Sequence, residues 1–338
     1  MELSSPPQVW SGLYVLVQET TPRSHRSFTG YVGNGAWNLG SLAVCLLAYL
    51  LRDWRSIQLC LATSSLLLLL YLPLLPESPR WLLSKGRTTQ AVHLLATMAR
   101  RNGVLVEQDQ LLASCTSLQQ VNQDKEPGCF NGLVSLFSHA PMRRQLLLLA
   151  PVFFITGMTS YGIHFAIRFA HLDLFTVGSL KEAAAMLLML LLLYLHPRVD
   201  RTSGLVTTYL LAGTITLLAL LLPFSWRGGL LIISQALFIG LYFLLDVYVI
   251  EILPTEVRNF GFNLLESVSK TGSALAPFVV DLGGETVVLA VFGTLSLVAA
   301  LPLVGLPETR GRALLQRVGE VGGREGGSSI VERLRRTK

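Results

Sequence analysis

Long apolar runs dominate this sequence and limit what it can fold into. A helix crosses a bilayer with about 20 consecutive, mostly apolar residues. Eight stretches reach or approach that length: 28–51, 56–75, 145–167, 172–195, 205–223, 229–250, 260–281 and 286–306. With 51% hydrophobic residues, 14% charged residues and a mean hydropathy of +0.53, the composition excludes an ordinary water-soluble globule. We therefore predict an all-α, multi-pass membrane protein.

Two polar signatures recur at nearly the same spacing along the chain. Residues 19–26 and 251–258 share one frame, namely an acid, two residues, a proline, three residues and an arginine. Residues 76–80 (PESPR) likewise resemble residues 307–310 (PETR). The first pair is 232 positions apart and the second is 231 apart. Two independent signatures at one spacing indicate a duplicated chain, and a long apolar repeat is typical of transporters with parallel halves.

The repeat also predicts how much of each half the chain contains. Four apolar runs precede Glu251 in the second half, whereas only the short run 10–17 precedes Glu19. By symmetry, roughly three and a half helices are missing from the first half. We expect four regions: the remnant of an N-terminal bundle at 1–75, a cytoplasmic connector with helices near 88–101 and 108–121 at 76–144, a complete six-helix bundle at 145–306, and a disordered cytoplasmic tail at 307–338.

Positive charge is distributed unevenly between the two sides of the predicted membrane. We place the loop of Glu251 in the cytoplasm. Of the 27 Lys and Arg residues, 21 then fall on the cytoplasmic side, 4 fall outside, and Lys181 and Lys270 lie within spans. This split obeys the positive-inside rule. It argues against a nucleic-acid-binding face, because the charges lie at the ends of the spans.

The sequence contains none of the short motifs that mark common enzymes. It has no nucleotide-binding loop, no H-E-x-x-H and no nucleophile elbow, so we do not expect an enzyme. Its four cysteines lack the spacing of a disulfide framework or a metal site. We therefore expect no cofactor and no bound metal.

Three segments resemble one transporter family. Residues 76–87 are similar to the loop after helix six of the organic cation/anion/zwitterion transporters (solute carrier family 22) of the major facilitator superfamily. Residues 251–259 resemble that family's loop between helices ten and eleven, and residues 306–311 resemble its segment after helix twelve. The pair Tyr161-Gly162 is similar to an aromatic–glycine pair of helix seven.

The resemblance covers nearly the whole chain from about residue 11, and it carries implications for fold and function. It implies a major facilitator-type helical bundle with an incomplete N-terminal half, about 8–9 of 12 helices in all, and a complete C-terminal half. The implied activity is secondary-active transport of organic ions by alternating access, with the plasma membrane as the expected location. The family's first helices and their D-R-x-G-R-R-type loop are not present, so we expect an N-terminally shortened member.

The paired polar loops are candidates for gating. An acid near a helix end and an arginine a few residues later can form salt bridges between loops, which hold one access state closed. By resemblance, we predict this role for Asp200, Arg201, Glu251, Arg258, Glu308 and Arg310, and for the first-half residues Glu19, Arg26, Glu77 and Arg80. The alternative role is anchoring of the topology by positive charge alone.

Ionisable residues within spans are costly, so each one is a functional hypothesis. Lys270 lies twelve residues after Arg258, about 18 Å along a helix and thus near mid-membrane. The resemblance implies that this position selects substrate charge, and a lysine favours organic anions. Glu266, one turn earlier, leaves open a neutral structural pair. A helix-eight position that the resemblance makes basic in anion transporters is the apolar Met186 here.

Aromatic side chains on the spans suit a cavity for bulky amphiphilic ions. We predict substrate contacts for Trp37, Phe154, Tyr161 and Tyr242 together with Lys270, and for each aromatic residue the alternative is packing or lipid contact. The expected partners are a small organic ion and the lipid bilayer. A second hypothesis for the whole chain is a truncated, non-transporting membrane protein that regulates a full-length relative by association.

Overall fold

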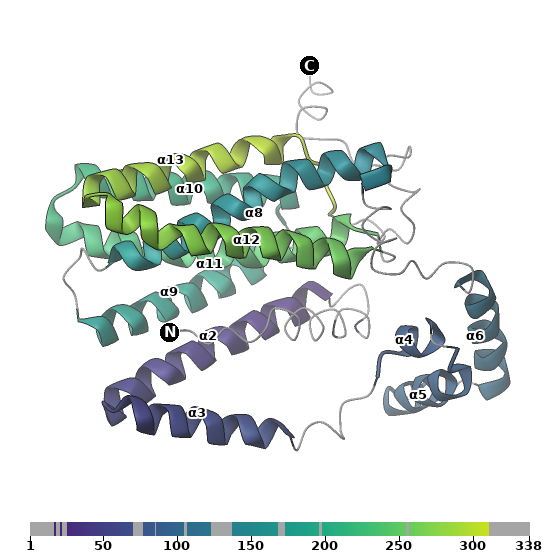
Figure 1. Cartoon of the computed structure of the whole chain (residues 1–338). Coiled ribbons are helices and arrows are strands. Elements are labelled where there is room, and N and C mark those ends of the chain that lie inside the picture. Colours follow the sequence, from purple (N-terminus) through teal and green to yellow (C-terminus); the bar gives the residue numbers. More distant parts are fainter. Residues whose placement is uncertain are drawn as a thin grey trace.

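The structure is a computed structural model of the chain. It describes residues 17, 21, 26–69, 77–84, 86–104, 107–122, 137–167, 173–195, 198–254 and 257–310. The regular elements in these ranges are helices (Figure 1), so the all-helical prediction is confirmed. They are α2 (Arg26–Leu51), α3 (Trp54–Leu69), α4 (Pro79–Ser84), α5 (Thr88–Arg101), α6 (Gln108–Asn122), α8 (Ala140–Ala166), α9 (Leu174–Leu195), α10 (Arg201–Leu221), α11 (Phe224–Ile252), α12 (Arg258–Leu282) and α13 (Glu285–Val304).

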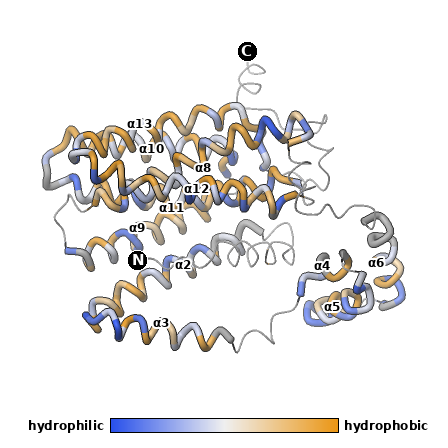
Figure 2. The backbone as a smooth tube through the Cα atoms, viewed as in Figure 1, coloured by the Kyte–Doolittle hydropathy of each residue, from blue (hydrophilic) through white to orange (hydrophobic). Residues whose placement is uncertain are grey.

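Each of the eight predicted spans corresponds to a helix. Within the described residues, six helices are long and apolar enough to cross a membrane: α2, α8, α9, α10, α11 and α13. The span predicted at 56–75 is described only as the 16 residues of α3. The span predicted at 260–281 is α12, which carries Arg258, Glu266, Lys270 and Asp281 and is therefore less apolar than the others. Figure 2 shows the long hydrophobic stretches of the other bundle helices.

Helices α8 to α13 pack into one bundle (Figure 1). Its main contacts pair α8 with α12, α10 with α13, α10 with α11, and α8 with α13. Large side chains fill the centre of the bundle, among them Phe153, Tyr209, Phe238 and Phe292. Because lipid is as apolar as these side chains, close packing and interhelical hydrogen bonds hold the helices together, rather than the hydrophobic effect.

Glycines allow the closest helix crossings in this bundle. A Cβ atom on Gly157 of α8 would lie 2.0 Å from the backbone oxygen of Ser269 on α12. A Cβ atom on Gly272 of α12 would lie 2.1 Å from the backbone oxygen of Phe154 on α8. Neither position can hold a side chain without moving a backbone, so the two glycines set how near α8 and α12 approach.

The N-terminal helices α2 and α3 lie beside the bundle (Figure 1). Helix α2 packs against α9, with the rings of Tyr49 and Phe175 in edge-to-face contact at 5.8 Å. The connector helices expected near 88–101 and 108–121 are α5 and α6, which pack with α4 into a separate small cluster. The helix remnant expected before Glu19 and the tail after residue 310 lie outside the described residues.

Candidate functional site

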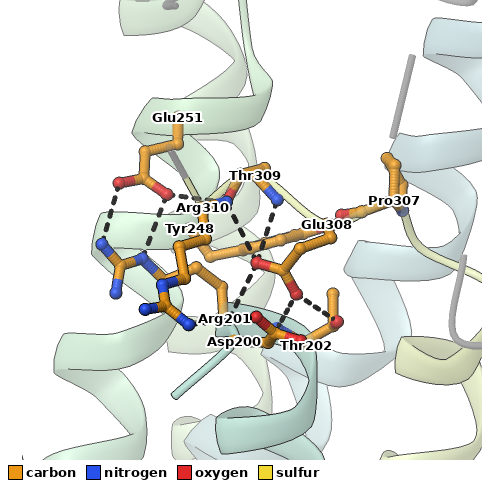
Figure 3. A network of polar contacts seen from close by, with 9 residues as sticks. All are labelled: Asp200, Arg201, Thr202, Tyr248, Glu251, Pro307, Glu308, Thr309 and Arg310. Carbon is orange, nitrogen blue, oxygen red and sulfur yellow. Dashed lines mark hydrogen bonds and ion pairs between the residues drawn. The ribbon is translucent and has the colours of Figure 1, made fainter. Parts of the chain in front are cut away.

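A polar network joins the start of α10, the end of α11 and the segment after α13 (Figure 3). Glu308 lies at its centre. Its carboxylate accepts hydrogen bonds from the backbone N–H of Arg201 at 2.8 Å, the backbone N–H of Thr202 at 3.1 Å and the hydroxyl of Thr202 at 2.7 Å. The first N–H groups of a helix have no partner within the helix. Glu308 therefore caps α10 across more than a hundred residues of sequence, and its charge suits the positive end of the helix dipole.

These hydrogen bonds also decide the charge of Glu308. Burial by itself raises the pKa of this carboxyl. The Thr202 hydroxyl and the N–H groups of Arg310, Arg201 and Thr202 lower it by more, so the pKa lies below its ordinary value. Glu308 is thus an anion at neutral pH, as a cap that complements the helix dipole requires.

Ion pairs extend the network to its remaining members. Arg201 lies 3.3 Å from Glu251 at the end of α11, and the Thr309 hydroxyl donates to Glu251 at 2.6 Å. Arg310 lies 3.4 Å from Asp200. The structure thus brings together five of the residues predicted for gating: Asp200, Arg201, Glu251, Glu308 and Arg310. The network also contains three residues that were not predicted for gating, namely Thr202, Thr309 and Tyr248; the Tyr248 hydroxyl donates to the carbonyl of Pro307 at 2.7 Å.

Arg258, predicted as a gating residue, is only 6% exposed and folds back on its own loop. Its guanidinium donates to the carbonyl of Leu253 at 3.1 and 3.2 Å, where a cation suits the carboxyl end of α11. Of the first-half residues, Glu77 is exposed, and Glu19 lies outside the described residues. Arg26 and Arg80 are described as helical backbone only.

A second group of polar residues lies within the predicted spans of α8, α11 and α12. We call it the intramembrane cluster; its members are Tyr161, Tyr242, Asp246, Glu266, Ser269 and Lys270. Tyr242 and Ser269 share a hydrogen bond of 2.9 Å. Tyr242 also interacts electrostatically with Glu266 and with Tyr161. Three of the five predicted substrate contacts, namely Lys270, Tyr161 and Tyr242, therefore lie in one place.

The expected Lys270–Glu266 pair forms, but it is long. The ammonium lies 4.0 Å from the nearest Glu266 oxygen, and 46% of the Lys270 side chain is exposed. A strong charge-assisted hydrogen bond would be about 2.8 Å. Asp246, which is 8% exposed, interacts electrostatically with both residues.

The other two predicted contacts lie apart from this cluster. Phe154 packs against the hydrophobic core at the crossing of α8 and α12. Trp37 is on α2 and is 53% exposed.

Helix α9 carries a third polar group, next to α2. Lys181 lies 3.2 Å from Glu182 and 3.5 Å from the imidazole of His164. Glu182 and Met186 face Asn38 of α2 across a cavity of about 330 Å³, whose wall is otherwise apolar. Within the described residues, no group of histidine, cysteine and acidic residues could hold a metal ion.

A bundle of membrane-length helices that carries charged residues along its spans and a polar network at one end defines a multi-pass helical membrane protein. Residues 13–317 match the sugar (and other) transporter family, and the chain belongs to that family.

Relatives at moderate identity cover almost the whole chain. The beta-alanine transporter of Drosophila melanogaster is 28% identical over 327 residues, which are 93% of this chain and 53% of that protein. Human solute carrier family 22 member 2 is 26% identical over 92% of this chain and 56% of its own length. Xenopus laevis solute carrier family 22 member 6-A is 25% identical over 90% and 56%. The chain thus spans about half the length of these relatives.

A solved structure supports the major facilitator fold. The proton:xylose symporter XylE, bound to 6-bromo-6-deoxy-D-glucose, aligns with a TM-score of 0.67 over 89% of this chain and 68% of its own, at 17% identity. At that identity the likeness shows the fold alone. The fold predicted from the resemblance is confirmed.

Proposed function

We propose that this chain is a secondary-active transporter of organic ions, that it works by alternating access at the plasma membrane, and that it prefers organic anions. Lys270 is the observation that carries the proposal. Its side chain lies on α12 within the predicted span, is about half exposed and is held only loosely by Glu266 at 4.0 Å. A cation in this position can bind a substrate anion without first breaking a tight ion pair.

The aromatic members of the intramembrane cluster support a bulky, amphiphilic substrate. Tyr161 and Tyr242 come from facing helices and bring both ring surface and hydroxyl groups to the neighbourhood of Lys270. Ring faces bind apolar bodies, and a few polar groups orient the charged end of a ligand. We expect the substrate to be an aromatic or branched organic acid.

The polar network around Glu308 supports alternating access in a specific way. Its described contacts join α10, α11 and α13, all of which belong to the C-terminal bundle. It therefore fastens the helices of one half into a unit that can rock as a rigid body. In this proposal the network stabilises the half of the transporter that moves. It does not require a salt bridge to the other half. Its residues are Asp200, Arg201, Glu251, Glu308 and Arg310.

Uptake into cells that express the 338-residue chain tests the proposal. The probes are radiolabelled p-toluenesulfonate as the anion, phenyltrimethylammonium as the cation and beta-alanine as the zwitterion. We expect saturable uptake of the sulfonate that Lys270→Ala abolishes and Lys270→Arg largely retains. Lys181→Ala, on α9, is the matched control and should leave sulfonate uptake in place. Surface expression without uptake of any probe would instead favour a regulatory protein that associates with full-length relatives.

A further inference from the structure

Asp246 is a buried acid that the proposed substrate contacts do not use. It lies in the last third of α11, one turn after Tyr242, and is only 8% exposed. Its Oδ1 atom is fully buried and has no hydrogen-bond partner among the described residues. A carboxylate oxygen without a donor in such a place is costly, and binding of a proton removes most of that cost.

Asp246 lies on the same face of α11 as Tyr242, another member of the intramembrane cluster. Gln235, Tyr242 and Asp246 are separated by seven and four residues, so they share one face of α11. Tyr242 on that face is bonded to Ser269 of α12 at 2.9 Å. Asp246 accordingly interacts electrostatically with Glu266 and Lys270, which lie on α12 as well.

The other helices packed against α11 add few charges near Asp246. Those of α9, Lys181 and Glu182, pair with each other at 3.2 Å, and His164 of α8 lies beside Lys181. Tyr161 of α8 interacts with Tyr242, and Tyr209 of α10 is hydrogen bonded to Thr156. On α2, Cys45 lies near the Lys181–Glu182 pair. The charges that act on Asp246 are therefore those of Glu266 and Lys270.

The sum of these charges depends on one proton. With Asp246 and Glu266 ionised and Lys270 protonated, the cluster carries one net negative charge. That charge repels the organic anion that Lys270 would attract. When Asp246 binds a proton, the cluster becomes neutral and Lys270 is left with one counter-ion at 4.0 Å.

We infer that Asp246 is a proton-binding site that couples proton entry to organic-anion entry, so that the chain is a proton–anion symporter. This inference rests on the proposed function. In each cycle, a proton from the outer solution binds the Asp246 carboxylate, the anion binds beside Lys270, and both leave on the other side as the carboxylate is regenerated. One proton and one monovalent anion cross together, so this step moves no net charge.

The test uses the purified 338-residue chain in liposomes with trapped pyranine and an internal pH of 7.5. The probe is p-toluenesulfonate, because it stays ionised at every pH used and only the protein titrates. Uptake should rise roughly tenfold when the external pH falls from 7.5 to 5.5, because the binding-competent fraction rises with protonation. Addition of the sulfonate at equal pH on both sides should acidify the interior.

Variants separate coupling from folding. Asp246→Asn mimics the protonated acid, so its uptake should be independent of pH and should not acidify the interior. Asp246→Glu keeps a titratable group and should keep the pH dependence of uptake. If it does, the loss of pH dependence in Asp246→Asn comes from the missing carboxyl and not from a folding defect. Glu285→Gln removes a carboxyl from the ion pair with Arg227 at the far end of the bundle and should behave as wild type.

Four results would overturn the inference. Wild-type uptake that is equal at both pH values, or uptake without acidification, refutes the symport but leaves the proposed function standing. Uptake of phenyltrimethylammonium that rises with pH would instead mean that a cation competes with the proton at Asp246. Absence of any uptake by the wild type refutes the proposed function itself, and the symport with it.

Discussion

Replacement of Glu308 by alanine should loosen the C-terminal bundle measurably. Three donors on α10 lose their acceptor in this variant: the backbone N–H of Arg201, the backbone N–H of Thr202 and the Thr202 hydroxyl. The backbone N–H groups of Thr309 and Arg310, in the segment of Glu308 itself, lose theirs as well. An unsatisfied buried donor costs about 1–3 kcal/mol. The site is near the end of the bundle, where water replaces part of each bond, so the lower value applies and the sum over the three donors of α10 is about 3 kcal/mol.

This cost should appear as a lower melting temperature in detergent. For a bundle of this size, 1 kcal/mol corresponds to about 2–4 °C, so the Tm of Glu308→Ala should fall by about 6–12 °C. Size-exclusion chromatography with tryptophan detection after a heating series measures it. Thr202→Val removes one donor and should lower Tm by about a third as much. In the Glu308→Ala background, Thr202→Val should cost less, because its acceptor is already gone.

Glu285→Ala is the matched control for the loss of a carboxylate. Its partly exposed ion pair with Arg227 is worth at most about 1 kcal/mol. A Tm of Glu308→Ala within 2 °C of the wild type would show that the helix cap contributes little. Equal losses of Tm from Glu308→Ala and Glu285→Ala would also contradict a specific role of the helix cap, since the loss of a charge alone would then explain both.

Two further predictions concern packing and pH. Gly272→Ala places a methyl group 2.1 Å from the backbone oxygen of Phe154 and should destabilise the fold by about 2 kcal/mol or more. The control Gly33→Ala has open space around it and should leave Tm unchanged. Equal Tm values for the two variants would contradict a tight crossing of α8 and α12. The pKa of Glu308 lies below its ordinary value of 4.5. The ionised carboxylate therefore contributes its full stabilisation of the fold above about pH 4.5, and this contribution is lost as pH falls through the folded-state pKa. The Tm difference between wild type and Glu308→Gln should therefore be constant at neutral pH and shrink in acid, and a difference that grows in acid would contradict the assigned shift.

Hydropathy was sufficient to locate the helices of the eight apolar runs but not to place their ends. Helix α8 begins at Ala140, five residues before the predicted span, because helix formation continues through the polar residues 143–145. The length of an apolar run indicates whether a segment can span the membrane. The ends of a helix depend instead on local capping and on the element that packs against it. The span predicted at 260–281 does form a helix, α12, but its charged residues keep it out of the group of helices apolar enough to cross a membrane.

The charged pair Arg201–Glu251 could be anticipated because recurring acids and arginines in neighbouring loops tend to meet. The cap of α10 by Glu308 could not, because its donors are backbone N–H groups that any residue carries. Asp246 could be recognised from sequence as an acid within a span. Its missing hydrogen-bond partner depends on how α8, α11 and α12 pack, which no single segment reveals.

Counterflow by the purified chain is the decisive assay for organic-ion transport by alternating access. Liposomes that contain only the 338-residue protein are loaded with unlabelled p-toluenesulfonate and diluted into labelled probe. Alternating access at a single site predicts a transient accumulation of label above its equilibrium level, which Lys270→Ala removes. Liposomes that bind the probe without accumulating it, or that accumulate it equally with Lys270→Ala, would contradict the account.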